Sequence, residues 1–154
     1  MKALTHAFPI ESATWRDIKA LDRLEKTCFG DDAWPLIELL GVLAFPGVVR
    51  LKAVADGEMV GFIAGDARRD WHTGWILTLG VLPNWRRRGI ADALLEECEH
   101  QMNMKKVRLT VRRANLPALS LYQKLGYSQV EVWPKYYHNG EDGLVLEKIL
   151  EKTN

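Results

Sequence analysis

The sequence contains little cysteine, with Cys28 and Cys98 as the two among 154 residues. Two cysteines so far apart fit neither a disulfide framework nor the close spacing of a set of metal ligands. We therefore interpret them as buried thiols of a protein in a reducing cytoplasm, and we expect no bound metal.

The chain also lacks long apolar runs and a charge excess of one sign. No stretch approaches the roughly 18 apolar residues of a membrane span, and the N-terminal segment has no apolar core of a signal peptide. The formal net charge is +1, so no strong field draws the protein to nucleic acid or membranes. We expect a cytoplasmic protein without nucleic-acid or membrane partners, in which any basic site is local.

The hydrophobic pattern predicts a single domain over residues 1–154, with elements in the order β-α-α-β-β-β-α-β-α-β-β. This order indicates an α/β (α+β) fold, a mixed sheet with helices on both faces, and argues against a doubly wound dinucleotide fold. The expected elements are a strand over 3–8, helices over 11–29 and 34–45, a hairpin over 48–70, a buried strand over 74–82, a helix over 89–103, a strand over 106–112, a helix over 116–125 and two strands within 127–150.

Short local signals mark the ends of several of these elements. Thr14 and Asp17 resemble a helix-capping box, and Pro35 suits the first turn of the second helix. Asp56-Gly57 accepts the positive φ angles of a tight hairpin turn. The helix over 116–125 is expected to be capped by Asn115 and ended by Gly126.

Three consecutive arginines, Arg86 to Arg88, precede Gly89 where the helix over 89–103 begins. The first amides of a helix lack internal partners and carry the positive end of its dipole. A glycine there lets an anion approach the backbone closely, so the loop favours a phosphate or diphosphate. The loop has neither the Gly-Lys-Ser/Thr of a P-loop nor the three glycines of a dinucleotide-binding turn.

Two other interpretations of the arginine run remain open. It can be a solvated helix start, or it can be a nucleic-acid patch. The balanced net charge and the acidic outer face expected for the helix, formed by Glu96, Glu97 and Glu99, argue against the patch.

A second motif follows the strand over 106–112 and consists of Asn115, Ala118, Leu121 and Tyr122. Together with the loop of Arg86, Gly89 and Ala91, it resembles the GCN5-related N-acetyltransferase (GNAT) superfamily. The family loop Gln/Arg-x-x-Gly-x-Gly/Ala is matched by Arg86, Gly89 and Ala91, and the family helix with Asn-x-x-Ala and Leu-Tyr is matched by Asn115, Ala118, Leu121 and Tyr122. The tail "YYHNGEDGLVL" is similar to that of the RimI-like N-terminal acetyltransferases. The resemblance covers roughly residues 45–150 and implies a mostly antiparallel sheet with a splayed central strand pair.

The resemblance implies acetyl-CoA as the cosubstrate and an amine as the acceptor. The backbone amides that would bind the diphosphate are those of Arg87, Arg88, Gly89, Ile90, Ala91 and Asp92, with side-chain contacts from the arginines. Leu79, Gly80 and Val81 would pair with the pantetheine arm, and Gly80 also permits a β-bulge. An amide near Leu79 would stabilise the developing oxyanion, and Asn115 would hydrogen-bond the pantetheine.

Tyr122 would act, by resemblance, as the general acid that protonates the leaving thiolate. From the residues alone, the favoured interpretation of Tyr122 is a buried core tyrosine. RimI-like enzymes commonly carry Glu, and some relatives His, five residues before the Asn, where this chain has Thr110. Thr110 cannot act as a base but can hold a water. The remaining candidate bases are Glu38, Asp70, His72, His138 and Glu141, each of which is otherwise a surface residue.

The acceptor groove would be lined by Trp75, Thr110, Tyr136, Tyr137 and His138. Trp34, Trp71, Trp75 and Trp133 would form an apolar acceptor pocket, or would pack in a core or dimer interface. We expect direct transfer to a primary amine by a monomer or homodimer, with a peptide N-terminus or lysine favoured over a small molecule. The alternatives are a non-catalytic acyl-CoA sensor, which the absence of Glu at Thr110 motivates, and nucleic-acid binding through Arg86–Arg88 and Arg112–Arg113.

Overall fold

The predicted hairpin turns at Asp56 and Gly57. In the computed structural model, which describes residues 8–150, β2 (Val48–Ala55) pairs antiparallel with β3 (Glu58–Arg68). Asp56 and Gly57 have φ angles of 52° and 75°, the left-handed values that a tight two-residue hairpin turn requires. This part of the sequence prediction is confirmed.

The first described strand, β1 (Ile10–Ser12), pairs antiparallel with β2. Residues 3–7 of the strand expected over 3–8 lie outside the described residues, and the chain bends at Phe8. Pro9 has no amide hydrogen to donate to a ladder, and its carbonyl accepts from the Val54 amide at 3.1 Å. Among the residues that the structure describes, regular pairing therefore starts after the proline.

Within residues 8–150, seven strands form the sheet. The remaining four are β4 (Thr73–Val81), β5 (Lys106–Arg112), β6 (Ser128–Trp133) and β7 (Gly143–Ile149). Their order across the sheet is β1-β2-β3-β4-β5-β7-β6. The β4–β5 ladder is parallel, and the ladders β1–β2, β2–β3, β5–β7 and β6–β7 are antiparallel. The predicted mixed, mostly antiparallel sheet is confirmed.

The parallel ladder between β4 and β5 is short. It joins Thr73–Trp75 to Lys106–Arg108, whereas the antiparallel ladder of β5 with β7 runs along the whole of β5. A short ladder at the start of both strands agrees with the expected splayed pair.

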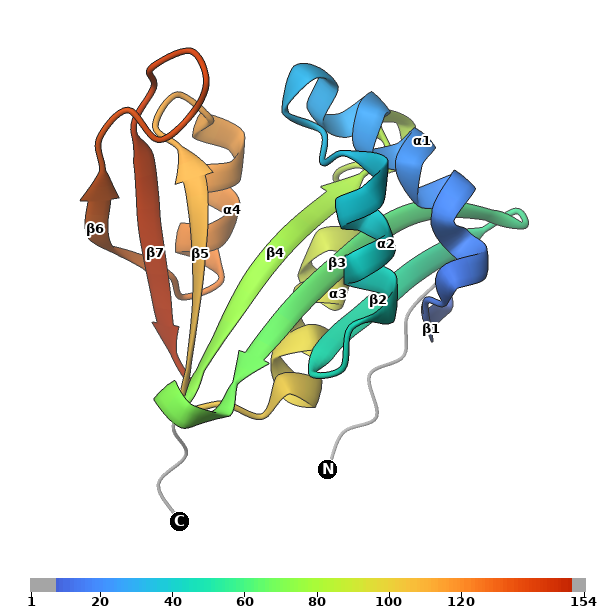
Figure 1. Ribbon diagram of the computed structural model, residues 1–154, viewed down its shortest axis with the longest axis horizontal. Coiled ribbons are helices and arrows are strands. Elements are labelled where there is room, and N and C mark those ends of the chain that lie inside the picture. Colours follow the sequence, from blue (N-terminus) through green and yellow to red (C-terminus); the bar gives the residue numbers. More distant parts are fainter. Residues whose placement is uncertain (1–7, 151–154) are drawn as a thin grey trace. The chain divides into compact units, whose positions relative to one another are not determined.

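The described residues form two compact units, residues 8–66 with 77–102, and residues 67–76 with 103–150. In the first unit, α1 (Ile18–Phe29) and α2 (Leu36–Ala44) lie on one face of the strands and α3 (Ile90–Met102) lies on the other (Figure 1). Glycines permit this close approach, because a Cβ on Gly80 would lie 3.2 Å from Leu24 of α1, and one on Gly61 would lie 2.9 Å from Ile90 of α3.

The helix ends agree with the local signals in most places. Thr14 and Asp17 form the predicted capping box around a short 3₁₀ turn, η1 (Trp15–Asp17), that leads into α1. The helix expected from residue 11 therefore begins at Trp15, because Glu11 and Ser12 belong to β1. Pro35 immediately precedes α2.

The core of the first unit lies between α1, α2 and β3, and includes Leu21, Leu24, Leu39, Val42, Leu43, Phe62 and Ala64. On α3 one prediction is wrong. Glu99, expected to face outward with Glu96, is buried and only 6% exposed, because it follows the buried Leu95 by one helical turn.

In the second unit, α4 (Leu116–Lys124) packs beside the strands β5, β7 and β6 (Figure 1). The Asn115 side chain caps α4 as predicted, since its Oδ1 accepts from the Ala118 amide at 3.2 Å. Gly126, with a φ of 99°, follows the end of the helix. Among the described residues, no helix is both long enough and apolar enough to cross a membrane.

Candidate active site

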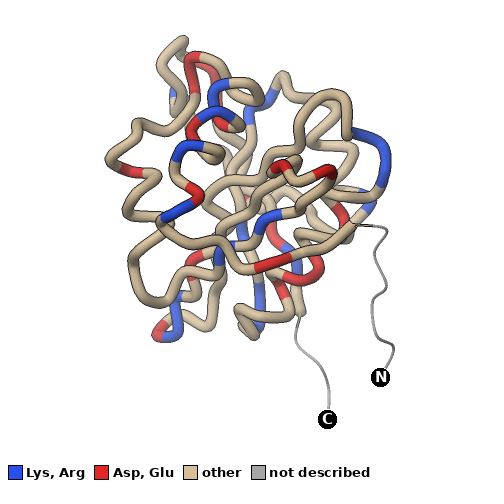
Figure 2. Tube along the Cα trace, turned by 90° about the vertical axis from the view of Figure 1, so that its right-hand side faces the viewer, with Lys and Arg blue, Asp and Glu red and all other residues tan. Residues whose placement is uncertain are grey.

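The arginine run lies in the loop between β4 and α3, where the backbone is left-handed at two positions. Arg87 has a φ of 64° and Gly89 a φ of 82°, directly before α3 begins at Ile90. Backbone that passes through left-handed residues can turn its amides toward one point, which makes a concave binding place for an anion. Figure 2 shows the run as the longest continuous basic stretch of the trace.

Two of the three arginine side chains have partners within this loop. The Arg86 Nε donates to the Val81 carbonyl at 2.9 Å, and the Arg88 Nη2 donates to the Asn84 carbonyl at 3.1 Å. The Arg88 guanidinium also lies 4.6 Å from the ring centre of Trp85. Arg86 and Arg88 therefore help to hold the loop in shape, and their predicted contact with phosphates stays a prediction.

Gly89 leaves open space above the loop. A Cβ built on Gly89 would meet no heavy atom of the described residues within 4 Å, and the left-handed φ of Gly89 is a conformation that other residues rarely adopt. The local backbone, rather than crowding, therefore accounts for this glycine. The open space is what a ligand that binds the backbone amides needs.

The end of β4 is tied to the loop and to α1. The Val81 carbonyl accepts from Arg86 and also from the Cys28 thiol at 3.5 Å, and burial raises the pKa of that thiol. A Cβ on Gly80 would lie 3.2 Å from the Cys28 sulfur. The close approach of α1 thus explains Gly80, and the predicted bulge is not needed for it.

Glu25, on α1, is a buried carboxyl that the sequence analysis did not single out. It is 0% exposed, and it accepts hydrogen bonds from the Thr78 hydroxyl at 2.6 Å and from the Trp34 amide at 3.3 Å. Burial raises its pKa, against the effect of these two donors. The sequence contains a signal for this burial, because Glu25 follows Leu21 by four residues and so lies on the apolar face of the helix.

Tyr122 lies on α4 and is 9% exposed, with its ring edge-on to Tyr127 at a centroid distance of 5.8 Å. Burial raises the pKa of Tyr122 to about 12, and the nearby Tyr137 adds to the effect. The phenol therefore keeps its proton at neutral pH. A general acid must carry its proton in this way, and the role itself stays a prediction.

Glu141 holds the loop between β6 and β7 in place through several hydrogen bonds. Its carboxylate accepts from the Ala114 amide at 2.7 Å and from Arg112 at 2.8 Å, and its own amide donates to the Asn139 side chain at 3.0 Å. The Ala114 amide and then Arg112 lower the pKa of Glu141. A carboxylate with a lowered pKa is a weak base, so Glu141 is a poor candidate for accepting the proton of the amine.

Four of the residues predicted to contact the acceptor gather in the second unit. Trp75, Thr110 and Tyr136 lie on one face of its strands, and Tyr137 contacts Tyr136 at a centroid distance of 5.0 Å. His138 follows as an exposed residue of the β6–β7 loop. Of the other tryptophans, Trp133 joins this group by stacking on Trp75 with centroids 5.9 Å apart.

The remaining tryptophans and candidate bases lie elsewhere. Trp34 packs against the core of the first unit, and Trp71 is 64% exposed before β4. The His72 carbonyl accepts from the Lys106 amide at the start of β5, about 13 Å along that strand from Thr110 at the usual rise per residue. Asp70 lies in the same turn, and Glu38 is exposed on α2. The structure therefore does not bring Asp70 or His72 to Thr110.

Residues 15–127 match the model of the Acetyltransferase (GNAT) family. An uncharacterized N-acetyltransferase of Methanocaldococcus jannaschii is 32% identical over 137 residues, which cover 86% of each chain. An N-alpha-acetyltransferase of Saccharolobus solfataricus is 28% identical over 159 residues, which cover 93% of each chain.

The fold is also that of a solved acetyltransferase. The crystal structure of the ribosomal-protein-S18-alanine N-acetyltransferase from Escherichia coli superposes with a TM-score of 0.86 at 20% identity, over 96% of each chain. The sequence motifs, the strand order and these similarities agree. The chain belongs to the GNAT acetyltransferase family and is an N-acetyltransferase.

Proposed function

We propose that this enzyme transfers the acetyl group of acetyl-CoA to the α-amino group of a peptide or protein N-terminus. The main structural support for this proposal is the loop before α3, in which Arg87 and Gly89 are left-handed and the space above Gly89 is open. Family membership supports acetyl-CoA as the donor. The similarity to an N-alpha-acetyltransferase over 93% of each chain supports a terminal amine as the acceptor.

The amides that hold the diphosphate in this proposal are those of Arg87, Arg88, Gly89, Ile90, Ala91 and Asp92. The helix dipole adds a favourable field for an anion at that point. The backbone of Leu79, Gly80 and Val81 pairs with the pantetheine, and Asn115, whose oxygen caps α4, offers its amide nitrogen. The open space above Gly89 fits such a ligand, since no heavy atom of residues 8–150 lies within 4 Å of a Cβ built there.

Bound acetyl-CoA supplies the thioester whose carbonyl carbon the amine attacks. The Leu79 amide stabilises the negative charge that develops on the carbonyl oxygen. As the carbon–nitrogen bond forms and the carbon–sulfur bond breaks, Tyr122 donates its proton to the sulfur and later regains one from solvent. The ammonium form of the acceptor loses its proton to water, and Thr110 holds that water, because a hydroxyl can both donate and accept.

The acceptor in this proposal lies against the face that carries Trp75, Thr110, Tyr136 and Tyr137, with His138 at its edge. We also propose that both units act together as the single catalytic domain, because the family match includes residues of both.

The experiment is incubation with acetyl-CoA and a library of peptides with free or blocked N-termini, together with polyamines. Thiol release and mass spectrometry are the readouts. We expect one acetyl group on the α-amine of free peptides, with one CoA thiol released for each. Reaction of lysine side chains or polyamines alone would contradict the acceptor, and binding of acetyl-CoA without thiol release would indicate a non-catalytic sensor.

A further inference from the structure

Four aromatic side chains form a continuous row in the second unit, and we name Trp75, Trp133, Tyr136 and Tyr137 the aromatic row. Trp75 and Trp133 stack with centroids 5.9 Å apart and an interplanar angle of 21°. Trp133 contacts Tyr136 at 5.2 Å, and Tyr136 meets Tyr137 edge-on at 5.0 Å. Tyr136 is 53% exposed, and the other three side chains are half-buried. The row therefore offers ring surface to a ligand.

The row crosses the sheet above small side chains. Trp75 belongs to β4 and Trp133 to β6, with β5 and β7 between them, so the two backbones are about 14 Å apart at the usual strand spacing. Ring centres 5.9 Å apart require the two indoles to lean toward each other over β5 and β7. A Cβ on Gly143 would lie 2.9 Å from Thr110 and 3.1 Å from the Tyr136 ring, so small residues make the floor.

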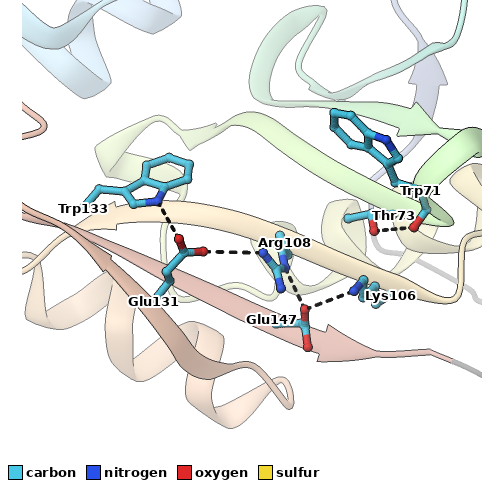
Figure 3. Close-up of polar contacts among 7 residues, drawn as sticks. All are labelled: Trp71, Thr73, Lys106, Arg108, Glu131, Trp133 and Glu147. Atoms are coloured by element: carbon cyan, nitrogen blue, oxygen red, sulfur yellow. Dashed lines mark hydrogen bonds and ion pairs between the residues drawn. The ribbon is translucent and has the colours of Figure 1, made fainter.

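The charged groups on this face already have partners. Arg108 lies 2.7 Å from Glu147 and 3.6 Å from Glu131, and the Trp133 indole donates to Glu131 at 3.2 Å (Figure 3). Lys106 lies 3.9 Å from Glu147 (Figure 3).

At the other end of the face, Arg112 pairs with Glu141 at 2.8 Å and also lies 4.1 Å from the ring centre of Tyr137. Each of the three cations of β5 is thus balanced by a carboxylate. A charged side chain of a ligand would have to break one of these pairs, whereas an apolar side chain would gain contact with the rings.

We propose that the aromatic row binds the first side chain of the acceptor peptide and selects residues with a large apolar or aromatic side chain. This inference rests on the proposed transfer to a peptide N-terminus. Trp133 is then a specificity-determining residue, because it joins the indole of Trp75 to the two tyrosines. The balanced charges predict that acidic and basic first residues are both poor acceptors.

The test compares kcat/KM for peptides that differ only in their first residue, namely Phe, Leu, Ala, Ser, Asp and Lys. For the wild type we expect Phe and Leu to exceed Ser and Asp by about tenfold, which corresponds to about 1.4 kcal/mol. Trp133→Leu should lower the Phe-to-Ala ratio mainly through KM, and Trp133→Phe should restore part of it. Trp71→Leu is the matched control, because Trp71 is exposed and lies outside the row.

Each outcome separates this inference from the proposed function. If the Phe-to-Ala ratio of kcat/KM falls in Trp133→Leu and is unchanged in Trp71→Leu, the result supports selection of the first residue by the aromatic row. Acetylation of all peptides with a preference for Ser or Ala, or an unchanged ratio in Trp133→Leu at wild-type thermal stability, would overturn the row and leave the transfer to peptides intact. If Trp133→Leu does not fold, Tyr136→Leu gives the same comparison. Absence of peptide acetylation would overturn both.

Discussion

The Glu25 carboxylate accepts a 2.6 Å hydrogen bond from the Thr78 hydroxyl, which joins α1 to β4 inside the first unit. Burial raises the pKa of Glu25 above its ordinary value of 4.5. The folded protein therefore holds this proton at pH values where the unfolded chain has released it. The contribution of Glu25 to the free energy of unfolding is therefore largest below pH 4.5, and it falls as the pH rises from there to the raised pKa.

Glu25→Gln removes this titration and keeps a side chain that can hydrogen-bond Thr78. We expect the unfolding free energy of the variant to increase relative to that of the wild type as the pH rises from about 4 to about 8. Urea unfolding at several pH values measures this difference. Glu38→Gln, at an exposed carboxylate of α2, is the control and should show no such trend. A difference for Glu25→Gln that does not change with pH would contradict the assignment.

Gly89→Ala should weaken acetyl-CoA binding more than it weakens the fold. An alanine at a φ of 82° costs about 1 kcal/mol of stability, and its methyl group enters the space where the diphosphate would approach the amides. We expect the KM for acetyl-CoA to rise about tenfold or more, as steady-state kinetics would show. The matched control is Gly47→Ala, at a φ of 83° with equally open space, which should lose similar stability without a change in KM.

Tyr122→Phe should lower kcat by about 10² to 10⁴ with the KM for acetyl-CoA nearly unchanged. The control is Tyr127→Phe, which also removes a phenolic hydroxyl, but from the neighbouring ring that contacts Tyr122. Since the pKa of Tyr122 is about 12, the acid form dominates at every lower pH. The wild-type rate should therefore rise as the α-amine loses its proton near pH 8, and should not fall again below about pH 11. Wild-type turnover in Tyr122→Phe would exclude the acid role.

Glu141→Gln should affect the acceptor more than the chemical step. The Ala114 amide and Arg112 hold the Glu141 carboxylate, so its loss loosens the loop that carries Tyr136 and Tyr137. We expect a severalfold higher KM for the peptide, a small change in kcat and an unchanged pH profile. If kcat fell more than a hundredfold together with the loss of a titrating limb, Glu141 would be the base after all.

Most of the fold followed from local patterns in the sequence. Alternating and helical periodicities, the Asp56-Gly57 turn and the Asn115 cap depend on residues close in the chain, and the structure confirms them. Predicted element boundaries were wrong where pairing between strands distant in the sequence determines the structure. Glu11 and Ser12, for example, belong to β1 and not to the expected helix. The predicted exposure of Glu99 was wrong because it was inferred from the acidic side chain alone, whereas Glu99 is buried.

The candidate site was predictable only in part. The position of the arginine run before α3 and of Tyr122 on α4 followed from the motifs. The stacking of Trp75 on Trp133 could not be predicted, because it depends on a strand order in which β7 lies between β5 and β6. The contacts of Arg86 and Arg88 with carbonyls of the loop depend on backbone geometry that composition does not encode.

Backbone amide chemical shifts on addition of coenzyme A, compared with pantetheine, test the central claim most directly. Pantetheine lacks the diphosphate, so we expect large shifts with coenzyme A and small ones with pantetheine at the amides of Arg87, Arg88, Gly89, Ile90 and Ala91. Equal shifts with both ligands, or no response of these amides to coenzyme A, would contradict it.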